Sequence, residues 1–395
     1  MCCNLPTTEY LRGVLNGKRI IFVLEMLEMG GAERQALMLA RYLKEEIGAN
    51  VHVVGFNSPG AGARLCEELG IEWSIIPISI QTGRRKRYIA PFVFAFRLRK
   101  LKPDVLLSYT VSPNVLCGIA WRWTGAKSCV WNQRDEGTER ADRILEWCSV
   151  RNTPCFIANS QGGADFLTKV LGAEDRRVSV VHNGIQLPDP LITQTGWREK
   201  LGISPSAFTA CMVANFRWPK DHATLIRAWR QVIDHISACV DESPVLLFAG
   251  RFDGTAETAK ALTRELGLDG AVRFLGPVGD ISGLLGAVNL GILCSESEGM
   301  PNSVLESMSV GLPFVGSDVQ GIRDAVGPAG CEYLVTSRDA DGLSKMICRF
   351  IESPELCAEQ GEINAKRIKD EFLPEHMCNR ATQIISDSLV AGGNK

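Results

Sequence analysis

The residues best placed to do chemistry lie in the stretch CSESEGMPNSVLESMSVGLPFVGSD, from Cys294 to Asp318. An apolar run ends at Cys294, Pro301 suits the first turn of a helix, and Gly311 suits the end of that helix. A strand followed by a helix in this way aims backbone N–H groups at the carboxyl edge of a parallel sheet, where open α/β folds bind their ligands. The stretch is therefore predicted to bind a ligand.

Two glutamates of this stretch are candidate ligand-binding carboxylates. Glu298 lies in the predicted loop, and Glu306 lies eight residues later, inside the predicted helix. Carboxylate oxygens can accept hydrogen bonds from a pair of vicinal hydroxyls, such as those of a sugar or a ribose. A capping carboxylate and an unrelated surface glutamate are the alternative, but the surrounding loop, proline and glycine favour a ligand site.

Two cations follow another predicted strand, in VANFRWPKDHATLIRAW. Arg217 and Lys220 lie between that strand and a predicted helix, so they are expected to face the same ligand and to neutralise a diphosphate leaving group. Solvated surface charges remain the alternative. Of the histidines, His222 and His235 fall on helical patterns and are expected to face solvent.

A glycine turn follows the first predicted strand, in MGGAERQ. Gly30 and Gly31 can form a tight turn at the start of a helix, where backbone N–H groups can approach an anion. An ordinary strand-to-helix turn is the alternative. The turn lacks the G-x-G-x-x-G pattern, which argues against a dinucleotide-dependent dehydrogenase.

A basic segment, QTGRRKRYIAPFVFAFRLRKLKP, runs from Gln81 to Pro103 and contains no acidic residue. Apolar side chains such as Tyr88, Phe92 and Phe96 are interleaved with the basic ones, which is typical of a segment that lies in a membrane interface without spanning it. Binding to an anionic membrane surface is predicted, and a core helix with a solvated basic edge is the alternative. The predicted membrane or acceptor patch consists of Arg84, Arg85, Lys86 and Arg87. The other basic residues are Arg97, Arg99, Lys100 and Lys102.

Short apolar runs alternate with helical patterns along most of the chain, which is typical of parallel sheets covered by crossover helices. The strands expected in a first series are Arg19–Glu25, Val51–Phe56, Val105–Tyr109, Cys129–Gln133, Cys155–Ser160 and Val178–Gly184. Those expected in a second series are Phe208–Phe216, Val245–Arg251, Val272–Gly276, Leu290–Ser295 and Pro313–Asp318. Leu187–Thr195, with its two prolines, separates the series.

This pattern predicts two α/β domains, over residues 18–188 and 189–370. Residues 1–17 show no clear period and are expected to be loosely ordered. Residues 371–395 are expected to be helical and to pack back on the N-terminal domain.

Composition narrows the class of protein. The formal net charge of −2 argues against general nucleic-acid binding. The 14 cysteines form no C-x-x-C pair and no cluster with zinc-ligand spacing, and neither a metal site nor a cofactor is expected. No uninterrupted run of about 18 apolar residues occurs, and the N-terminus lacks the apolar core of a secretory signal. A cytoplasmic protein is therefore expected.

Together these motifs resemble the glycosyl transferases group 1 family of retaining enzymes with the GT-B fold. The most specific element is the E-x7-E motif, Glu298-GMPNSVL-Glu306. Further similar stretches are Met29–Gln35, Ile157–Gln161, Val180–Ile185, Asn215–Ile226 and Ala249–Gly254. The resemblance covers about Lys18–Leu389 and implies an α/β GT-B fold of two Rossmann-like parallel-sheet domains that face a central cleft. The N-terminal domain is then the acceptor side, and the C-terminal domain binds the nucleotide-sugar.

The resemblance also implies roles for particular residues. Glu306 would bind the ribose hydroxyls and Glu298 the hydroxyls of the donor sugar. Arg217 and Lys220 would hold the diphosphate and, with Glu298, carry the catalysis. The residues expected to line the sugar and phosphates are Gly31 from the N-terminal domain and Gly299, Met300, Pro301, Asn302 and Ser303.

The sequence departs from the family pattern at two places. Many members have an arginine five positions before the lysine, where this chain has Asn215, so Arg217 would supply the guanidinium from a shifted position. Many also have a histidine after the fourth N-terminal strand. Here Asn132 and Arg134 are the candidates for contacting the sugar or the acceptor.

The implied activity is retaining transfer of a sugar from a nucleotide diphosphate-sugar, with UDP expected, to a hydroxyl acceptor. The expected acceptor is a glycan or a lipid-linked intermediate of cell-envelope or exopolysaccharide synthesis, reached by a peripheral association with the inner face of the plasma membrane. A sugar-nucleotide epimerase or hydrolase on the same fold is one alternative. A non-enzymatic protein that binds nucleotide-sugars is another.

Overall fold

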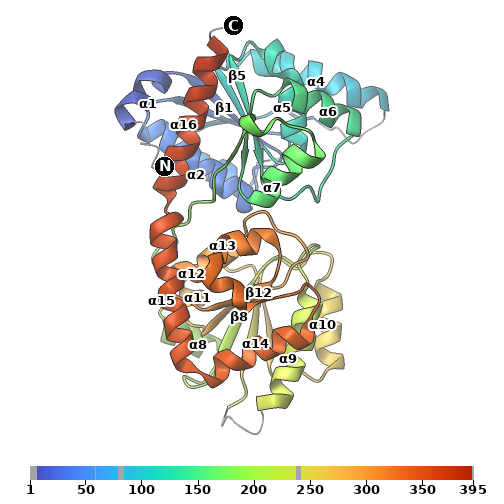
Figure 1. Cartoon of the computed structure of the whole chain (residues 1–395), viewed down its shortest axis with the longest axis vertical. Helices are drawn as coiled ribbons and strands as arrows, with labels where there is room; N and C mark the ends of the chain where they lie inside the picture. The colour runs from blue at the N-terminus through green and yellow to red at the C-terminus, as the bar shows by residue number, and fades with distance from the viewer. Residues whose placement is uncertain (1–6, 58, 79–83, 237–241, 394–395) are drawn as a thin grey trace. The chain divides into compact units, whose positions relative to one another are not determined.

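The computed structural model describes residues 7–57, 59–78, 84–236 and 242–393, with the side chains of all of these except 84–87 and 393. The chain divides into two compact units (Figure 1). Unit 1 comprises Met1–Gly184 and Pro374–Lys395, and unit 2 comprises Ile185–Leu373. Both boundaries lie within four residues of the expected ones. Unit 2 begins at Ile185, whose amide donates to the carbonyl of Phe372 at the other end of the same unit (2.8 Å).

Unit 1 is built on a parallel sheet with strand order β3-β2-β1-β4-β5-β6-β7. The strands are β1 (Arg19–Leu24), β2 (Asn50–Gly55), β3 (Glu72–Ile75), β4 (Val105–Tyr109), β5 (Ser128–Gln133), β6 (Cys155–Ala158) and β7 (Val178–Val180). Phe22 of the central strand β1 is in register with Val53 on one side and Leu107 on the other. All the strands predicted in the first series are present, and the edge strand β3 is additional.

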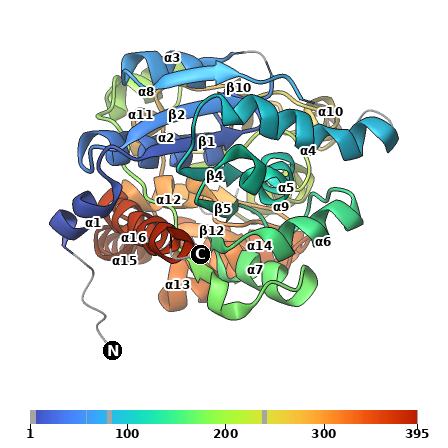
Figure 2. The ribbon, with the colours of Figure 1, turned by 90° about the horizontal axis from the view of Figure 1, so that it is seen from above.

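Two layers of helices cover this sheet (Figure 2). The helices are α1 (Thr8–Leu15), α2 (Gly31–Glu45), α3 (Ala61–Glu68), α4 (Arg84–Arg99), α5 (Val111–Thr124), α6 (Arg143–Asn152), α7 (Gln161–Asp165) and α16 (Pro374–Gly393). Ile20 and Phe22 lie in a buried cluster with residues of α1, α2 and α16. Ile21 and Val23 lie in another cluster with residues of α4 and α5. The alternation of β1 side chains thus separates the two layers.

The N-terminal segment differs from its prediction as a loosely ordered stretch. Residues 8–15 form α1, whose N-cap Thr7 accepts a hydrogen bond from the Tyr10 amide (3.4 Å). Leu11 and Leu15, four residues apart, are both buried against the layer that contains α16. Because the partner of this short helix lies at the other end of the chain, local periodicity does not reveal it. Residues 1–6 lie outside the described residues.

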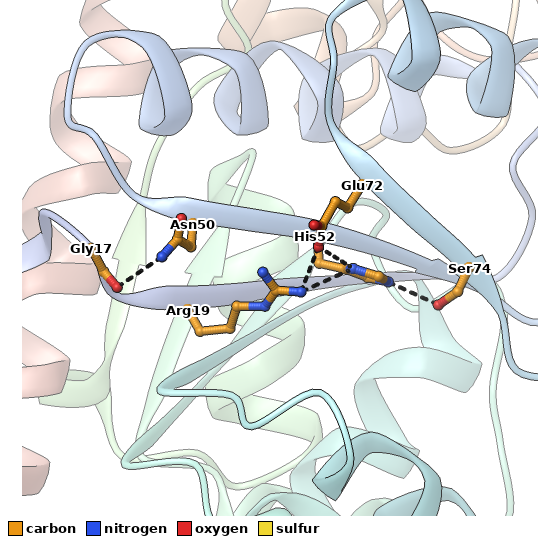
Figure 3. Close-up of polar contacts among 6 residues, drawn as sticks. All are labelled: Gly17, Arg19, Asn50, His52, Glu72 and Ser74. Atoms are coloured by element: carbon orange, nitrogen blue, oxygen red, sulfur yellow. Dashed lines mark hydrogen bonds and ion pairs between the residues drawn. The ribbon is translucent and has the colours of Figure 1, made fainter.

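A polar array joins β1, β2 and β3 (Figure 3). The Arg19 guanidinium donates to Glu72 (2.6 Å), while His52 contacts Glu72 through Nδ1 (3.2 Å) and Ser74 through Nε2 (2.8 Å). The order Ser-His-Glu is that of a nucleophile relay, which the sequence did not indicate. However, the array lies away from the carboxyl edge where ligands of α/β sheets bind, and Arg19 holds the carboxylate. We assign it to strand pairing.

Unit 2 is a second Rossmann-like parallel sheet, with order β10-β9-β8-β11-β12-β13. Its strands are β8 (Thr209–Val213), β9 (Val245–Ala249), β10 (Val272–Gly276), β11 (Leu290–Leu293), β12 (Phe314–Ser317) and β13 (Leu334–Val335). Its helices are α8 (Gln194–Leu201), α9 (His222–Ile236), α10 (Ala256–Glu265), α11 (Ile281–Gly286), α12 (Asn302–Ser309), α13 (Gln320–Gly330), α14 (Ala340–Glu352) and α15 (Pro354–Glu371). These sheets confirm the predicted fold of two Rossmann-like domains.

The two faces of the unit 2 sheet are also covered by separate clusters. Met212 of β8 packs in a cluster that includes Trp229 of α9, whereas the next residue back, Cys211, packs with Leu284 of α11. The start of the unit is fixed by Asp280, which accepts hydrogen bonds from the Leu191 amide (3.1 Å) and the Trp197 indole (2.8 Å). A rigid sheet therefore supports the loops at its carboxyl edge.

Candidate active site

Two loops of unit 2 are joined at the carboxyl edge of its sheet. One follows β8 and the other follows β11, and these strands are neighbours. Lys220 forms an antiparallel bridge with Ser295. The Asp221 amide donates to the Cys294 carbonyl (3.0 Å), and the Glu296 amide donates to the Pro219 carbonyl (3.0 Å). The predicted cationic loop and the predicted acidic loop are therefore one structural element.

Lys220 and Glu298 are in direct contact at this junction. The Lys220 ammonium donates to the Glu298 carboxylate, and the two side chains are 19% and 11% exposed. An ammonium has three donors and a carboxylate has two oxygens, so each group can also bind a phosphate oxygen or a hydroxyl. The structure thus brings together two of the residues predicted to carry the chemistry, which are 78 positions apart in the sequence.

Arg217 lies on the same loop with an exposed side chain. Its carbonyl accepts from the Lys220 amide (2.9 Å), which holds the two cations on one turn. Asn215 stands where many family members have arginine, and its side-chain oxygen accepts from the Arg251 amide (2.9 Å). Asn215 therefore fixes the neighbouring loop after β9.

Glu306 is buried, at 5% exposure, on α12. Pro301 precedes the helix, and its carbonyl accepts from the Val304 amide (3.2 Å). Asn302 and Ser303 form the first turn, while Gly299 and Met300 are buried in the loop before it. These backbone positions lie where the sequence placed them, at the end of a strand and the start of a helix.

Helix α13 packs closely against the backbone of this loop at Gly321. A Cβ atom on Gly321 would lie 1.8 Å from the Gly299 carbonyl oxygen and 2.3 Å from that of Glu298. Only glycine permits that approach. Arg338 adds a second restraint, because its guanidinium donates to Glu296 (2.7 Å). Gly321 lies in the small-residue run SVGLPFVGSDVQGI that follows the E-x7-E motif, whereas Arg338 belongs to no motif of the sequence.

His222 follows Lys220 by two residues, and the prediction that it faces solvent is wrong. It is 2% exposed, and its ring stacks on Phe216 with centroids 4.0 Å apart. Burial lowers the pKa of His222 to about 4. His235 does face solvent, where it contacts Glu352 (3.2 Å). The first residue of α9 is thus a packing residue of the site.

Two of the predicted unit 1 residues, Gly31 and Arg134, lie at the carboxyl edge of the other sheet. Gly31 begins α2 after Gly30. Arg134 donates to Asn183 (2.6 Å) and lies over the Tyr109 ring at 5.6 Å. Burial lowers the pKa of Arg134.

Asn132 lies inside that sheet, at 2% exposure. Its side chain donates to the Ser108 carbonyl (3.2 Å), and its own carbonyl accepts from Asn114 (2.8 Å). Of the two candidates for a sugar or acceptor contact, Arg134 is therefore at the edge and Asn132 is within the strand pairing.

Glu25 is a further carboxylate at this edge that the sequence analysis did not select. It directly follows β1 and accepts a hydrogen bond from the Ser112 hydroxyl (3.1 Å). Burial raises its pKa, and the nearby Glu139 adds to that effect. Burial likewise raises the pKa of Asp135, which follows β5 by two residues. The signal in the sequence that could have identified these two carboxylates is their position just after a predicted strand.

The basic patch Arg84, Arg85, Lys86 and Arg87 lies at the start of α4, and its side chains lie outside the described residues. Within the described ranges, no group of three or more histidine, cysteine, aspartate or glutamate side chains could hold a metal ion. The described helices include none that is long and apolar enough to cross a membrane.

Asp339 and Asp341 have the D-x-D spacing found at some metal sites, but both carboxylates serve the start of α14. Asp339 accepts from the Gly342 amide (2.8 Å), and Asp341 accepts from the Gln231 amide group (2.7 Å). This pair is therefore engaged in helix capping and packing.

Two Rossmann-like units, with a lysine–glutamate pair and a buried helical glutamate at the carboxyl edge of the second, define the class as GT-B-type glycosyltransferases. Residues 193–367 match the family Glycosyl transferases group 1, and residues 29–188 match Glycosyltransferase Family 4. Unit 2 therefore matches the glycosyl transferases group 1 family that its motifs predicted, and most of unit 1 matches a second glycosyltransferase family.

Individual relatives share about a quarter of their residues with this chain over the aligned part. The N-acetyl-alpha-D-glucosaminyl L-malate synthase of Bacillus anthracis is 26% identical over 196 residues, 49% of this chain and 49% of that protein. The UDP-Gal:alpha-D-GlcNAc-diphosphoundecaprenol alpha-1,3-galactosyltransferase of Escherichia coli is 24% identical over 267 residues, 65% of this chain and 68% of that protein. The chain thus spans about half the length of the first relative and two thirds of the second.

A solved structure of similar fold is that of Anabaena Alr3699/HepE in complex with UDP and glucose. The TM-score is 0.79 at 21% sequence identity, with 94% of this chain and 100% of that chain covered. At this level of identity the likeness concerns the fold.

Proposed function

We propose that this protein is a retaining glycosyltransferase that moves a sugar from a nucleotide diphosphate-sugar, with UDP as the nucleotide, to a hydroxyl acceptor. The contact of Lys220 with Glu298, beside the helix that carries Glu306, is the observation that carries the proposal. In the proposed site, Lys220 is the cation for the leaving diphosphate, and the adjacent Glu298 is the carboxylate for the sugar hydroxyls. The galactosyltransferase relative is named for a UDP-sugar donor, which supports the choice of nucleotide.

In the proposed reaction the acceptor hydroxyl attacks the anomeric carbon on the face from which the diphosphate leaves. The new carbon–oxygen bond forms as the bond to the phosphate oxygen breaks, and the hydroxyl proton passes to the departing phosphate. Lys220 and Arg217 stabilise the negative charge that grows on the diphosphate. Glu298 orients the sugar through its hydroxyls, and the first turn of α12 supplies N–H groups to the phosphates.

The acceptor is proposed to be a glycan or a lipid-linked intermediate of cell-envelope or exopolysaccharide synthesis. Support comes from the name of the galactosyltransferase relative, which specifies a diphosphoundecaprenol-linked acceptor. In unit 1, Arg134 and Glu25 at the carboxyl edge of the sheet are the proposed contacts for its polar groups. Gly31, at the start of α2, is proposed to approach the donor phosphates with its backbone amide.

Replacing Glu306 by glutamine is expected to weaken binding of both the nucleotide and the nucleotide-sugar roughly ten- to hundredfold. The reason is that a hydrogen bond to a charged group contributes about 1.5–3 kcal/mol, and the ribose would lose its carboxylate. Titration calorimetry with UDP and with UDP-sugars measures the change. The exposed Glu359→Gln on α15 is the matched control. Equal affinities in variant and parent would remove Glu306 from the nucleotide site.

Catalysis is proposed to need no metal ion, so activity is expected to survive excess EDTA. The proposal is based on Asp339 and Asp341, which occupy the only D-x-D spacing in the sequence. Asp339 caps α14, and Asp341 accepts a hydrogen bond from Gln231. Sugar transfer is measured before and after dialysis against the chelator. Loss of transfer that Mg²⁺ or Mn²⁺ restores would show a metal requirement.

A donor-only incubation separates this activity from its rivals. A transferase is expected to leave most of the nucleotide-sugar intact when no acceptor is present. Rapid release of free sugar, or conversion to its epimer, would instead identify a hydrolase or an epimerase. A panel of nucleotide-sugars screened by thermal stabilisation identifies the donor for this assay.

A further inference from the structure

Helices α4, α5 and α6 of unit 1 expose an unusual number of large apolar side chains. On α4, Phe96 is 69% and Phe92 is 57% exposed, and on α5 Trp123 is 45% exposed. On α6, Trp147 is 53% exposed. We call this set the aromatic face. Its members are Tyr88, Ile89, Phe92, Val93 and Phe96 of α4, Trp123 of α5, and Ile144 and Trp147 of α6.

The three helices lie side by side in one layer (Figures 1 and 2). The Phe92 and Trp123 rings stack across α4 and α5, with centroids 4.5 Å apart and an interplanar angle of 17°. This contact joins the apolar surfaces of the two helices while leaving both rings open to solvent. The aromatic face is therefore continuous at least across α4 and α5.

Packing within unit 1 does not explain these residues. The side of α4 that faces the sheet already buries Phe94, Ala95 and Leu98 in the core. The helix is thus apolar on its exposed side as well as on its buried side, and a helix that is apolar all round normally has its whole surface covered. Single exposed apolar residues are ordinary, whereas a contiguous patch of them marks an interaction site.

Cations accompany the aromatic rings. Lys100 lies over the Phe96 ring at 5.7 Å, and Arg151 lies over the Trp147 ring at 4.2 Å. Between positions 81 and 134, Asp104 is the only acidic residue, and Lys127 pairs with it (3.0 Å). The stretch that contains α4 and α5 is therefore positively charged, although the chain as a whole carries a net charge of −2.

We infer that the aromatic face inserts into the interface of an anionic lipid bilayer. Aromatic rings sit at the boundary between headgroups and acyl chains, and flanking Lys and Arg side chains reach from there to lipid phosphates. An anionic bilayer complements this combination of exposed rings and positively charged side chains. The inference extends the basic segment predicted from the sequence. It adds Trp123 and α6, and it assigns insertion to the rings, with the basic side chains giving salt-sensitive attraction.

Cosedimentation of the full chain with vesicles tests this inference. We expect binding to equimolar phosphatidylcholine and phosphatidylglycerol at low salt, and much weaker binding to phosphatidylcholine alone. The variant Phe92→Ser/Phe96→Ser is expected to lower the partition coefficient at least tenfold. Charge reversal at Arg84, Arg85 and Arg87 is expected to lower it by about fivefold per residue. Val170→Ser and Leu191→Ser, which alter exposed apolar residues that are not members of the aromatic face, are the controls.

Tryptophan fluorescence identifies the inserted residue. Vesicles that contain brominated lipid should quench the parent protein, and Trp123→Phe should remove a large part of that quenching. Retention of full vesicle binding by Phe92→Ser/Phe96→Ser would overturn the inference. So would lipid-independent dimerisation through these residues, which light scattering after size-exclusion chromatography detects.

The test is separate from the proposed function. Thermal stabilisation by UDP reports on the donor site of unit 2, so it should be unchanged in every variant of the aromatic face. A protein that binds vesicles without binding UDP would refute the proposed function and leave this inference standing. A protein that binds UDP but does not bind vesicles would refute this inference and leave the proposed function standing.

Discussion

Replacement of Lys220 by methionine is expected to lower kcat by about 10²–10³-fold, with a much smaller loss of affinity for UDP. An electrostatic group aimed at charge that develops in the transition state typically contributes this much, and an interaction made chiefly in the transition state changes kcat more than binding. The Lys220 side chain is mostly buried in the junction of the two loops, where the field of its charge is less screened than on the surface. Steady-state kinetics with the identified donor and calorimetry with UDP measure both quantities.

A control must separate this role from a structural one, because Lys220 also holds Glu298. Lys366→Met removes an exposed lysine paired within α15 and should leave the kinetics unchanged. If Lys220 only neutralises Glu298, Lys220→Met should have no further effect in a protein that already carries Glu298→Gln. If Lys220 acts on the diphosphate, Lys220→Met should lower kcat in the Glu298→Gln protein as well. Equal kcat values for Glu298→Gln and for the double variant would therefore refute the catalytic assignment.

The fold was readable from the sequence because its central strands are uninterrupted apolar runs. VLLSY and VLLFA, now β4 and β9, are buried on both faces, as parallel strands between two helix layers must be. The edge strand β3, with sequence EWSI, is half polar and was missed. The two-residue strand β13 is too short to carry a pattern. A strand at the edge of a sheet is partly exposed, so its sequence need not be an apolar run and is harder to recognise.

The site was readable only as separate motifs. Glu298 and Lys220 were each selected, but their contact depends on β8 and β11 being neighbours, which no local pattern determines. The restraints from Gly321 and Arg338 come from elements later in the chain. Gly321 lies in the small-residue run after Glu306, but its approach to Gly299 is not indicated there, and Arg338 has no distinctive local context. The helical pattern of α9 predicted that His222 faces solvent. In the structure, Phe216 and Phe248, which lie outside that helix, pack against its ring.

The buried His222 should make unit 2 sensitive to acid. Burial, the largest cause, holds its pKa at about 4 in the folded protein, against an ordinary value of about 6.5 in the unfolded chain. Below pH 6.5 the unfolded state binds a proton that the folded state rejects. The stability is therefore fully present above about pH 6.5 and is lost as the pH falls toward 4. The loss from this one group is about 3 kcal/mol.

The variant His222→Gln should be less stable than the parent at neutral pH, because glutamine cannot reproduce the ring stack on Phe216. Its further loss between about pH 6.5 and 4 should nevertheless be smaller by about 3 kcal/mol. The thermal transition that UDP stabilises reports on unit 2, so its midpoint is followed against pH with and without nucleotide. His235→Gln, which changes an exposed histidine at the end of the same helix, should keep the parent slope. Identical slopes for His222→Gln and the parent would mean that the ring is protonated as readily in the folded protein as in water, so it could not be the acid-sensitive element behind Lys220.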